Sequence, residues 1–161
     1  MALRDAFTAE EWAEVVAAPM LAGIAVTAAD PGGLWGALKE SVAVAGAVRG
    51  ATAGANPLVA EVAAAYETAE GRDLARGVLK AEARGKAPAA VVEAAVSGLA
   101  AAAAVVAAKA PEAAPGFKAW LQEVAAKVAA AGTEGGFLGF GGEQVSDAEK
   151  ATLDRLATAL A

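Results

Sequence analysis

A glycine-rich segment near the C-terminus, EGGFLGFGGEQ from Glu134 to Gln144, has a composition that could cradle a phosphate group. A dinucleotide fingerprint requires G-x-G-x-x-G between a strand and a helix, whereas Gln144 stands where the third glycine would fall. The Gly-Lys-Ser/Thr of a phosphate-binding P-loop is absent, and Glu134 and Glu143 would repel an anion. The spacing and charge therefore exclude nucleotide binding by this segment.

The apolar side chains of this segment, Phe137, Leu138 and Phe140, allow two interpretations. In the first, the glycines permit a tight loop that folds these side chains inward over the open end of a helical bundle. In the second, the side chains point outward and anchor a partner or an apolar ligand, as aromatic residues often do at binding hot spots. We predict the inward arrangement, because an alanine-rich core needs bulky groups to fill its gaps.

A basic segment is the second candidate site. Its positive side chains recur every fourth residue, at Arg72, Arg76, Lys80 and Arg84. On a helix this spacing forms one ridge, and neighbouring like charges repel each other. The ridge could bind an anion, an acidic partner or the chain's own acidic surface at Glu10, Glu11 and Glu14. A solvated helix face without a ligand is the alternative.

Catalytic chemistry has few possible carriers here. The chain contains no histidine and no cysteine, which excludes imidazole-based triads, cysteine nucleophiles and the usual zinc, haem and di-iron sites. Glu93 lies in an apolar segment, where we expect its carboxylate to be buried, and Tyr66 and Ser97 fit satisfied core or boundary positions. We therefore predict a protein that is not an enzyme and has no cofactor and no metal.

Composition points to helices. Alanine accounts for 51 of the 161 residues, Ile24 is the only isoleucine, and strand patterns are absent. The formal net charge of −6 argues against nucleic-acid binding. The uncharged stretches after Glu14 and after Glu93 each contain 15 residues, short of the roughly 18–20 that span a membrane. We expect a cytoplasmic protein without a transmembrane segment, of a composition typical of small alanine-rich bacterial proteins.

The pattern of caps, prolines and apolar stripes predicts an all-α, single-domain bundle of five or six mostly antiparallel, closely packed helices. Thr8 and Glu11 form a capping box flanked by Phe7 and Trp12, and Pro19 should bend or split the helix that follows. Asn56-Pro57 starts another helix, and Gly132 is a natural helix end. We expect helices near residues 9–29, 31–49, 57–69, 72–84, 89–109, 113–131 and 146–160.

Two functions agree with these features. The first is a structural or protein-interaction bundle that self-associates as a homodimer through apolar helix faces, because the helix at 89–109 is apolar nearly all round and must be central or part of an interface. The alternative is a carrier that holds an apolar small molecule or lipid among aromatic side chains. Its candidate contacts are Trp12, Trp35, Trp120, Phe137, Leu138 and Phe140.

Overall fold

The computed structural model describes residues 2–29, 44–46, 48, 56–134 and 147–161. These residues form helices and connecting turns and include no strand, which confirms the all-α prediction. The segment with Phe137, Leu138 and Phe140, whose side chains were expected to fold inward, lies outside the described residues, as does most of the helix expected at 31–49 with Trp35. The described elements are η1 (Leu3–Ala6), α1 (Ala9–Ala28), α3 (Pro57–Glu67), α4 (Ala69–Ala83), α5 (Pro88–Lys109), α6 (Ala114–Glu134) and α7 (Asp147–Leu160).

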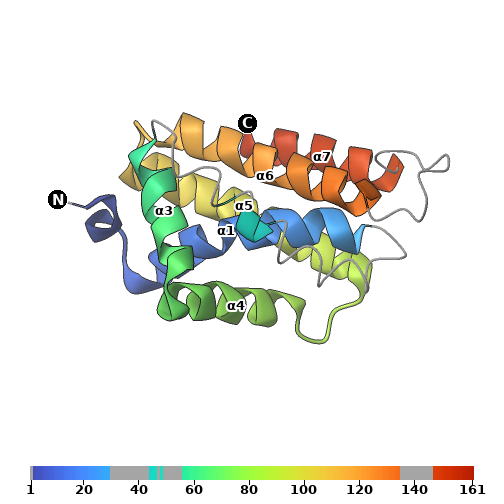
Figure 1. Ribbon diagram of the computed structural model, residues 1–161, viewed down its shortest axis with the longest axis horizontal. Helices are drawn as coiled ribbons and strands as arrows, with labels where there is room; N and C mark the ends of the chain where they lie inside the picture. The colour runs from blue at the N-terminus through green and yellow to red at the C-terminus, as the bar shows by residue number, and fades with distance from the viewer. Residues whose placement is uncertain (1, 30–43, 47, 49–55, 135–146) are drawn as a thin grey trace.

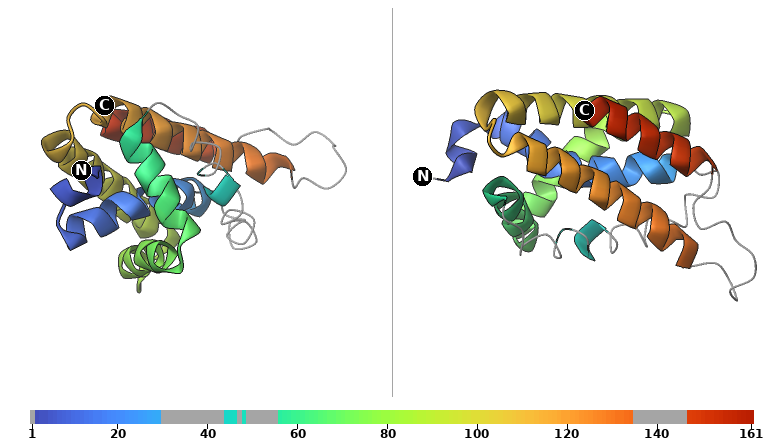
Figure 2. Two further views of the ribbon diagram at one scale, coloured as in Figure 1. Left: turned by 60° about the vertical axis from the view of Figure 1, so that its left-hand side comes forward. Right: turned by 90° about the horizontal axis from the view of Figure 1, so that it is seen from above.

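Four of the helices lie lengthwise beside one another. In Figure 1, α1 and α6 run in one direction, and α5 and α7 run in the opposite direction. The two further views in Figure 2 show the same arrangement, with α3 crossing one end of the bundle. Helix α4 packs mainly on α1 and also contacts α3 and α5. The packed, mostly antiparallel helices of the sequence prediction are therefore present.

Helix α1 begins as its sequence predicts. The Thr8 hydroxyl accepts a hydrogen bond from the Glu11 N–H (3.2 Å), and the Glu11 carboxylate accepts one from the Thr8 N–H (2.8 Å). Phe7 and Trp12 complete the hydrophobic staple with ring centroids 6.0 Å apart. The helix continues through Pro19, so the expected split is wrong. Tertiary packing can hold a proline within a helix at the cost of one backbone hydrogen bond.

The most enclosed helix is α1 and not α5. Of the most apolar 18-residue window in each helix, 67% is buried in α1 and only 33% in α5. Contacts with α3, α4, α5, α6 and α7 surround α1. The sequence allowed two positions for the helix at 89–109, either at the centre of the bundle or in an interface. The central position is wrong, because α1 occupies the centre. Both helices are long and apolar enough to cross a membrane by length and composition alone.

Small side chains allow the helices around α1 to approach closely. A Cβ atom at Gly98 of α5 would lie 2.9 Å from Leu21 Cδ1 of α1, and one at Gly23 of α1 would lie 2.7 Å from Val44 Cγ2. Most of the other buried residues of α1 are alanine or valine. Close packing in this core thus depends on the absence of side-chain atoms at particular positions.

Helix α3 and helix α4 meet at a corner around Thr68. Asn56 caps α3, accepting hydrogen bonds from the N–H groups of Leu58 (3.0 Å) and Val59 (3.2 Å), as predicted. Helix α3 ends at Glu67, and the Thr68 side chain serves both helices. Its hydroxyl donates to the Ala65 carbonyl (2.8 Å) and accepts from the Gly71 N–H (3.0 Å). Helix α4 therefore begins at Ala69 instead of Arg72, and neither Gly71 nor Gly77 interrupts it.

Helices α6 and α7 begin within one residue of their predicted starts, and α6 extends beyond its predicted end. The inner face of α6 is buried, at Phe117, Trp120, Leu121, Val124 and Val128. Its outer face carries an ion pair between Glu123 and Lys127 at 2.7 Å. Helix α6 continues through Gly132 to Glu134, so Gly132 is not its end. Helix α7 covers nearly the predicted range and buries Leu156 and Leu160.

The N-terminal 3-10 helix η1 was not predicted. Its first N–H groups are bound by a residue far away in the sequence: the two carboxylate oxygens of Glu61 in α3 accept from Leu3 N–H (2.8 Å) and Arg4 N–H (2.9 Å). The Arg4 guanidinium lies over the Trp12 ring at 5.9 Å. These contacts attach η1 to α3 and to the start of α1.

The corner at Thr68 predicts opposite effects for two glycine substitutions in one helix. A Cβ at Gly71 would lie 2.2 Å from the Ala65 carbonyl oxygen, whereas none of the atoms around a Cβ at Gly77 comes within 4 Å. We expect Gly71→Ala to lower the free energy of unfolding by about 1–3 kcal/mol, because the backbone must move. Gly77→Ala should raise it by up to about 1 kcal/mol through helix propensity.

Chemical denaturation of both variants measures this difference. Equal effects of the two substitutions would show that the close approach at Gly71 does not hold the corner.

Candidate interaction site

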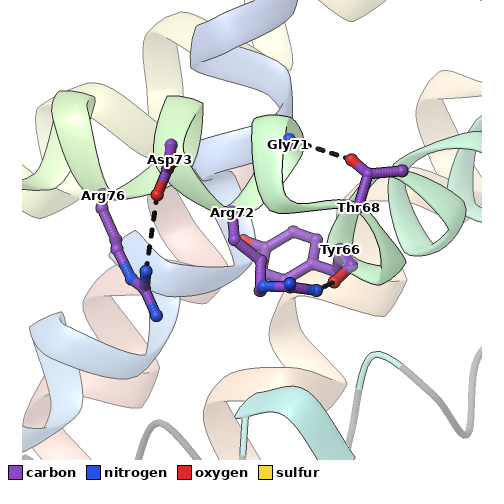
Figure 3. Close-up of polar contacts among 6 residues, drawn as sticks. All are labelled: Tyr66, Thr68, Gly71, Arg72, Asp73 and Arg76. Carbon is purple, nitrogen blue, oxygen red and sulfur yellow. Dashed lines mark hydrogen bonds and ion pairs between the residues drawn. The ribbon is translucent and has the colours of Figure 1, made fainter.

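The structure divides the predicted basic ridge. Arg72 is partly buried at the corner, where its Nη1 donates to the backbone carbonyl of Tyr66 at 2.8 Å (Figure 3). This carbonyl belongs to the last turn of α3, where backbone acceptors lack helical partners. Arg72 therefore acts as a cap for α3, and its charge is not free for a ligand.

The other members of the ridge are exposed. Arg76 forms an ion pair with Asp73 at 3.5 Å, with side chains that are 62% and 74% exposed (Figure 3). Exposed pairs of this kind contribute little to stability. Within the described ranges, Lys80 and Arg84 form no ion pair. What remains of the ridge is an open basic surface at Arg76, Lys80 and Arg84, which can attract acidic groups weakly.

The acidic surface of the first helix does not neutralise the ridge. The Glu11 carboxylate lies 3.6 Å from Lys109 Nζ at the end of α5. The Thr8 N–H, with Lys109, lowers the pKa of this carboxyl. Among the described ion pairs, none joins Glu10, Glu11 or Glu14 to α4. No described ion pair therefore supports the intramolecular partner that the sequence suggested for the ridge.

Tyr66 connects the corner to the central helix. Its hydroxyl donates to the backbone carbonyl of Val16 at 2.8 Å and is also in hydrogen-bond contact with the backbone N–H of Met20. Val16 and Met20 are the partners of one helical hydrogen bond, and the turn between them contains Pro19. Tyr66 therefore adds a side-chain donor to a backbone carbonyl in the turn that contains Pro19. Burial raises the pKa of the Tyr66 phenol, and the contact with the Met20 N–H opposes this only in part.

The aromatic candidates lie in two separate pairs. Trp12 packs against Phe7, and Trp120 packs against Phe117 with ring centroids 6.0 Å apart. Both tryptophans are buried, and no ring contact joins them in the part of the chain that the structure describes. The Trp120 Nε1–H is buried without a hydrogen-bond partner in this part of the chain. Trp35, Phe137, Leu138 and Phe140 lie outside the described residues.

Helix α5 presents an exposed apolar surface. Its outer positions are almost all small: Ala90, Ala94, Ser97, Ala101, Ala104 and Ala108 are exposed or half-buried. Glu93, expected to be buried, lies beside this surface with a side chain that is 67% exposed and pairs with Arg155 of α7 at 2.6 Å. The expected burial of Glu93 is therefore wrong. Its carboxylate stays on the outside of the bundle, where it pairs with Arg155 without losing its contact with water. We call these six outer positions the α5 face.

Sequence reasoning missed the residues that join elements distant in the chain. Thr68 had a local signal, since a threonine three residues before a free backbone N–H is a helix cap. The hydrogen-bond partners of Glu61 and Tyr66 had no local signal in the sequence, because they lie 58 and 50 residues away. Such contacts depend on how the helices pack.

Comparison with known proteins adds no function. No protein-family model matches the chain, and neither a curated protein nor a solved structure is significantly similar to it. The candidate surfaces therefore rest on their own chemistry. Among the described residues, no group of three or more acidic side chains could hold a metal ion.

The half-buried phenol of Tyr66 predicts a measurable pH dependence. Tyr66 is the only tyrosine of the chain, so phenolate absorbance reports on it alone. Because folding raises its pKa above the ordinary value near 10, the unfolded chain loses this proton first. The contribution of the protonated Tyr66 phenol to the free energy of unfolding is complete below pH 10 and falls as the pH rises above 10.

We expect the native protein to titrate later than the protein in denaturant. We also expect the difference in unfolding free energy between wild type and Tyr66→Phe to shrink above pH 10. This comparison removes the contribution of the lysines, which titrate in the same range. Titration of the native phenol near pH 10 would contradict the observed burial.

Proposed function

We propose that this chain is a cytoplasmic, non-enzymatic protein-interaction bundle that self-associates through the α5 face. One observation carries the proposal: the apolar window of α5 is only 33% buried, although it is long and apolar enough to cross a membrane. Apolar surface on this scale at the outside of a bundle is typical of an interface. The proposal assigns no catalytic residue.

A second copy of the same chain is the occupant that fits the surface best. Its small residues allow another helix to approach closely, and the closest approach is available to a helix with equally small side chains. The α5 face of a second copy provides such side chains. Most soluble homo-oligomers are symmetric dimers in which one surface meets itself.

The charges beside the α5 face favour an antiparallel pair. Glu93 and Lys109 each lie eight residues from Ala101, towards opposite ends of the helix. Their side chains are 67% and 40% exposed. In an antiparallel pair centred on Ala101, Glu93 of one copy lies at the level of Lys109 of the other. A parallel pair would place like charges at the same level, and its helix dipoles would also be less favourably aligned.

A carrier of an apolar small molecule is the second candidate. The buried Trp120 Nε1–H, which lacks a partner among the described residues, favours it. Buried donors are nearly always satisfied, and a ligand with a hydrogen-bond acceptor would satisfy this one. Native mass spectrometry separates the two functions, since a dimer mass without an adduct supports self-association and a stoichiometric bound mass supports the carrier.

Self-association predicts that one substitution on α5 separates the copies. Ala101→Glu places a charge at the centre of the α5 face, where pairing would bury it without a partner. We expect sedimentation velocity to show a dimer for the wild type and a dissociation constant at least about tenfold higher for this variant. The matched control is Ala126→Glu on the exposed side of α6, which should leave the dimer intact. A monomeric wild type at about 100 µM would overturn the proposal.

Cysteine crosslinking tests the antiparallel arrangement separately, because the chain contains no native cysteine. In an antiparallel pair centred on Ala101, the Ala101→Cys variant should form a disulfide-linked dimer. Ala94→Cys and Ala108→Cys should crosslink with each other when mixed. Neither should crosslink with itself, because the equivalent positions lie about 21 Å apart along the helices. Self-crosslinking of all three variants would instead indicate a parallel pair.

A further inference from the structure

Among the α-helices whose burial is described along their whole length, α4 is the least buried. Its only buried residues are Gly71 and Ala75, whereas α1 has buried residues along its whole length. Leu74, Val78 and Leu79 of α4 are half-buried against the core. Helix α4 therefore covers part of α1 with one narrow apolar side, while its other side faces solvent.

The polar attachments of α4 are concentrated at its first turn. There the Arg72 guanidinium donates to the Tyr66 carbonyl and the Gly71 N–H donates to the Thr68 hydroxyl (Figure 3). Tyr66 also joins this corner to α1 through its hydroxyl. By contrast, no described hydrogen bond or ion pair connects residues 77–86 to another helix. The ion pair of this part is internal, between Lys86 and Glu82 at 3.6 Å. The far end leads into Gly85, whose backbone adopts a positive φ of 70°.

The charge pattern further weakens α4 as an isolated helix. Arg72, Arg76 and Lys80 of α4 are spaced four residues apart, and each pair of like charges at this spacing disfavours the helix by a few tenths of a kcal/mol. Asp73 and Glu82 compensate only in part. A short helix with this pattern depends on its tertiary contacts, and segments with few buried contacts open at lower free energy than the core.

We infer that α4 is a strap that opens away from α1 without unfolding of the bundle, pivoting at the Tyr66–Thr68 corner and uncovering apolar surface of α1. The hydrogen bond from the Tyr66 hydroxyl to the Val16 carbonyl holds the pivot on α1, and we call it the latch. The strap requires neither the α5 face nor self-association, because the contacts that define it lie in α4 and at the Tyr66–Thr68 corner.

Two alanine positions allow opening of the strap to be compared with unfolding of the core. Ala75 of α4 and Ala125 of α6 are both fully buried, at 0% exposure. Because the chain has no cysteine, Ala75→Cys and Ala125→Cys each provide a single thiol whose labelling by a thiol reagent reports exposure of that site. Under native conditions we expect the Ala75→Cys thiol to be labelled at least about tenfold faster than the Ala125→Cys thiol.

The latch is tested by adding Tyr66→Phe to both variants. A latch predicts that labelling accelerates at position 75 by a larger factor than at position 125. Equal acceleration at the two positions would show that Tyr66 stabilises the whole bundle, and it would overturn the latch.

Native-state hydrogen exchange on the unmodified chain checks the strap without any cysteine. We expect the amides of α4 to exchange through an opening with little denaturant dependence, at a lower free energy than those of α1 and α6. If the amides of α4 exchange only together with those of α1 and α6, the strap is wrong.

Discussion

The close approach of small side chains around α1 is the constraint on which the rest of the bundle depends. Burial of an alanine methyl group contributes under about 1 kcal/mol, so a core rich in alanine needs dense packing from several sides. Five other helices contact α1, and Gly23 and Gly98 leave room for Val44 and Leu21. Once α1 is enclosed in this way, α5 has no central place left and lies at the outside. The proposed interface is thus a consequence of the packing around α1.

Polar joints set how the crossing helices sit on this core. The Asn56 side chain caps α3 and also donates through Nδ2 to the Ala113 carbonyl (2.9 Å), at the start of α6. A Cβ at Gly116 would lie 2.3 Å from this Nδ2, so the joint needs glycine there. Tyr66 does the same for the corner of α3 and α4 by binding the turn of α1 that contains Pro19. The Asn56 joint satisfies N–H groups at the start of α3 that have no helical partners, and the Tyr66 hydroxyl finds an acceptor in the Val16 carbonyl.

The candidate sites were predictable only where they depend on local spacing. The four-residue recurrence of Arg72, Arg76, Lys80 and Arg84 does place the first three on one helix, α4, and Arg84 follows directly after its last residue. Which of them is free was decided by the corner, because Arg72 binds the Tyr66 carbonyl. The same holds for α5: its apolar character can be read from the sequence, but its exposure depends on which helix takes the centre. Trp12 and Trp120 are buried, and each pairs with a phenylalanine of its own segment.

The sequence by itself determined the helical class, most helix starts and the inward faces, because caps, prolines and apolar periodicity act within one or two turns. The capping box at Thr8 and Glu11 and the amphipathic pattern of α6 are examples. Only the tertiary structure decided that α1 is central, that Glu93 pairs with Arg155 at the surface, and that Tyr66 reaches Val16. These outcomes depend on contacts across 50 residues or more, which compete for the same core space and have no signature in local spacing.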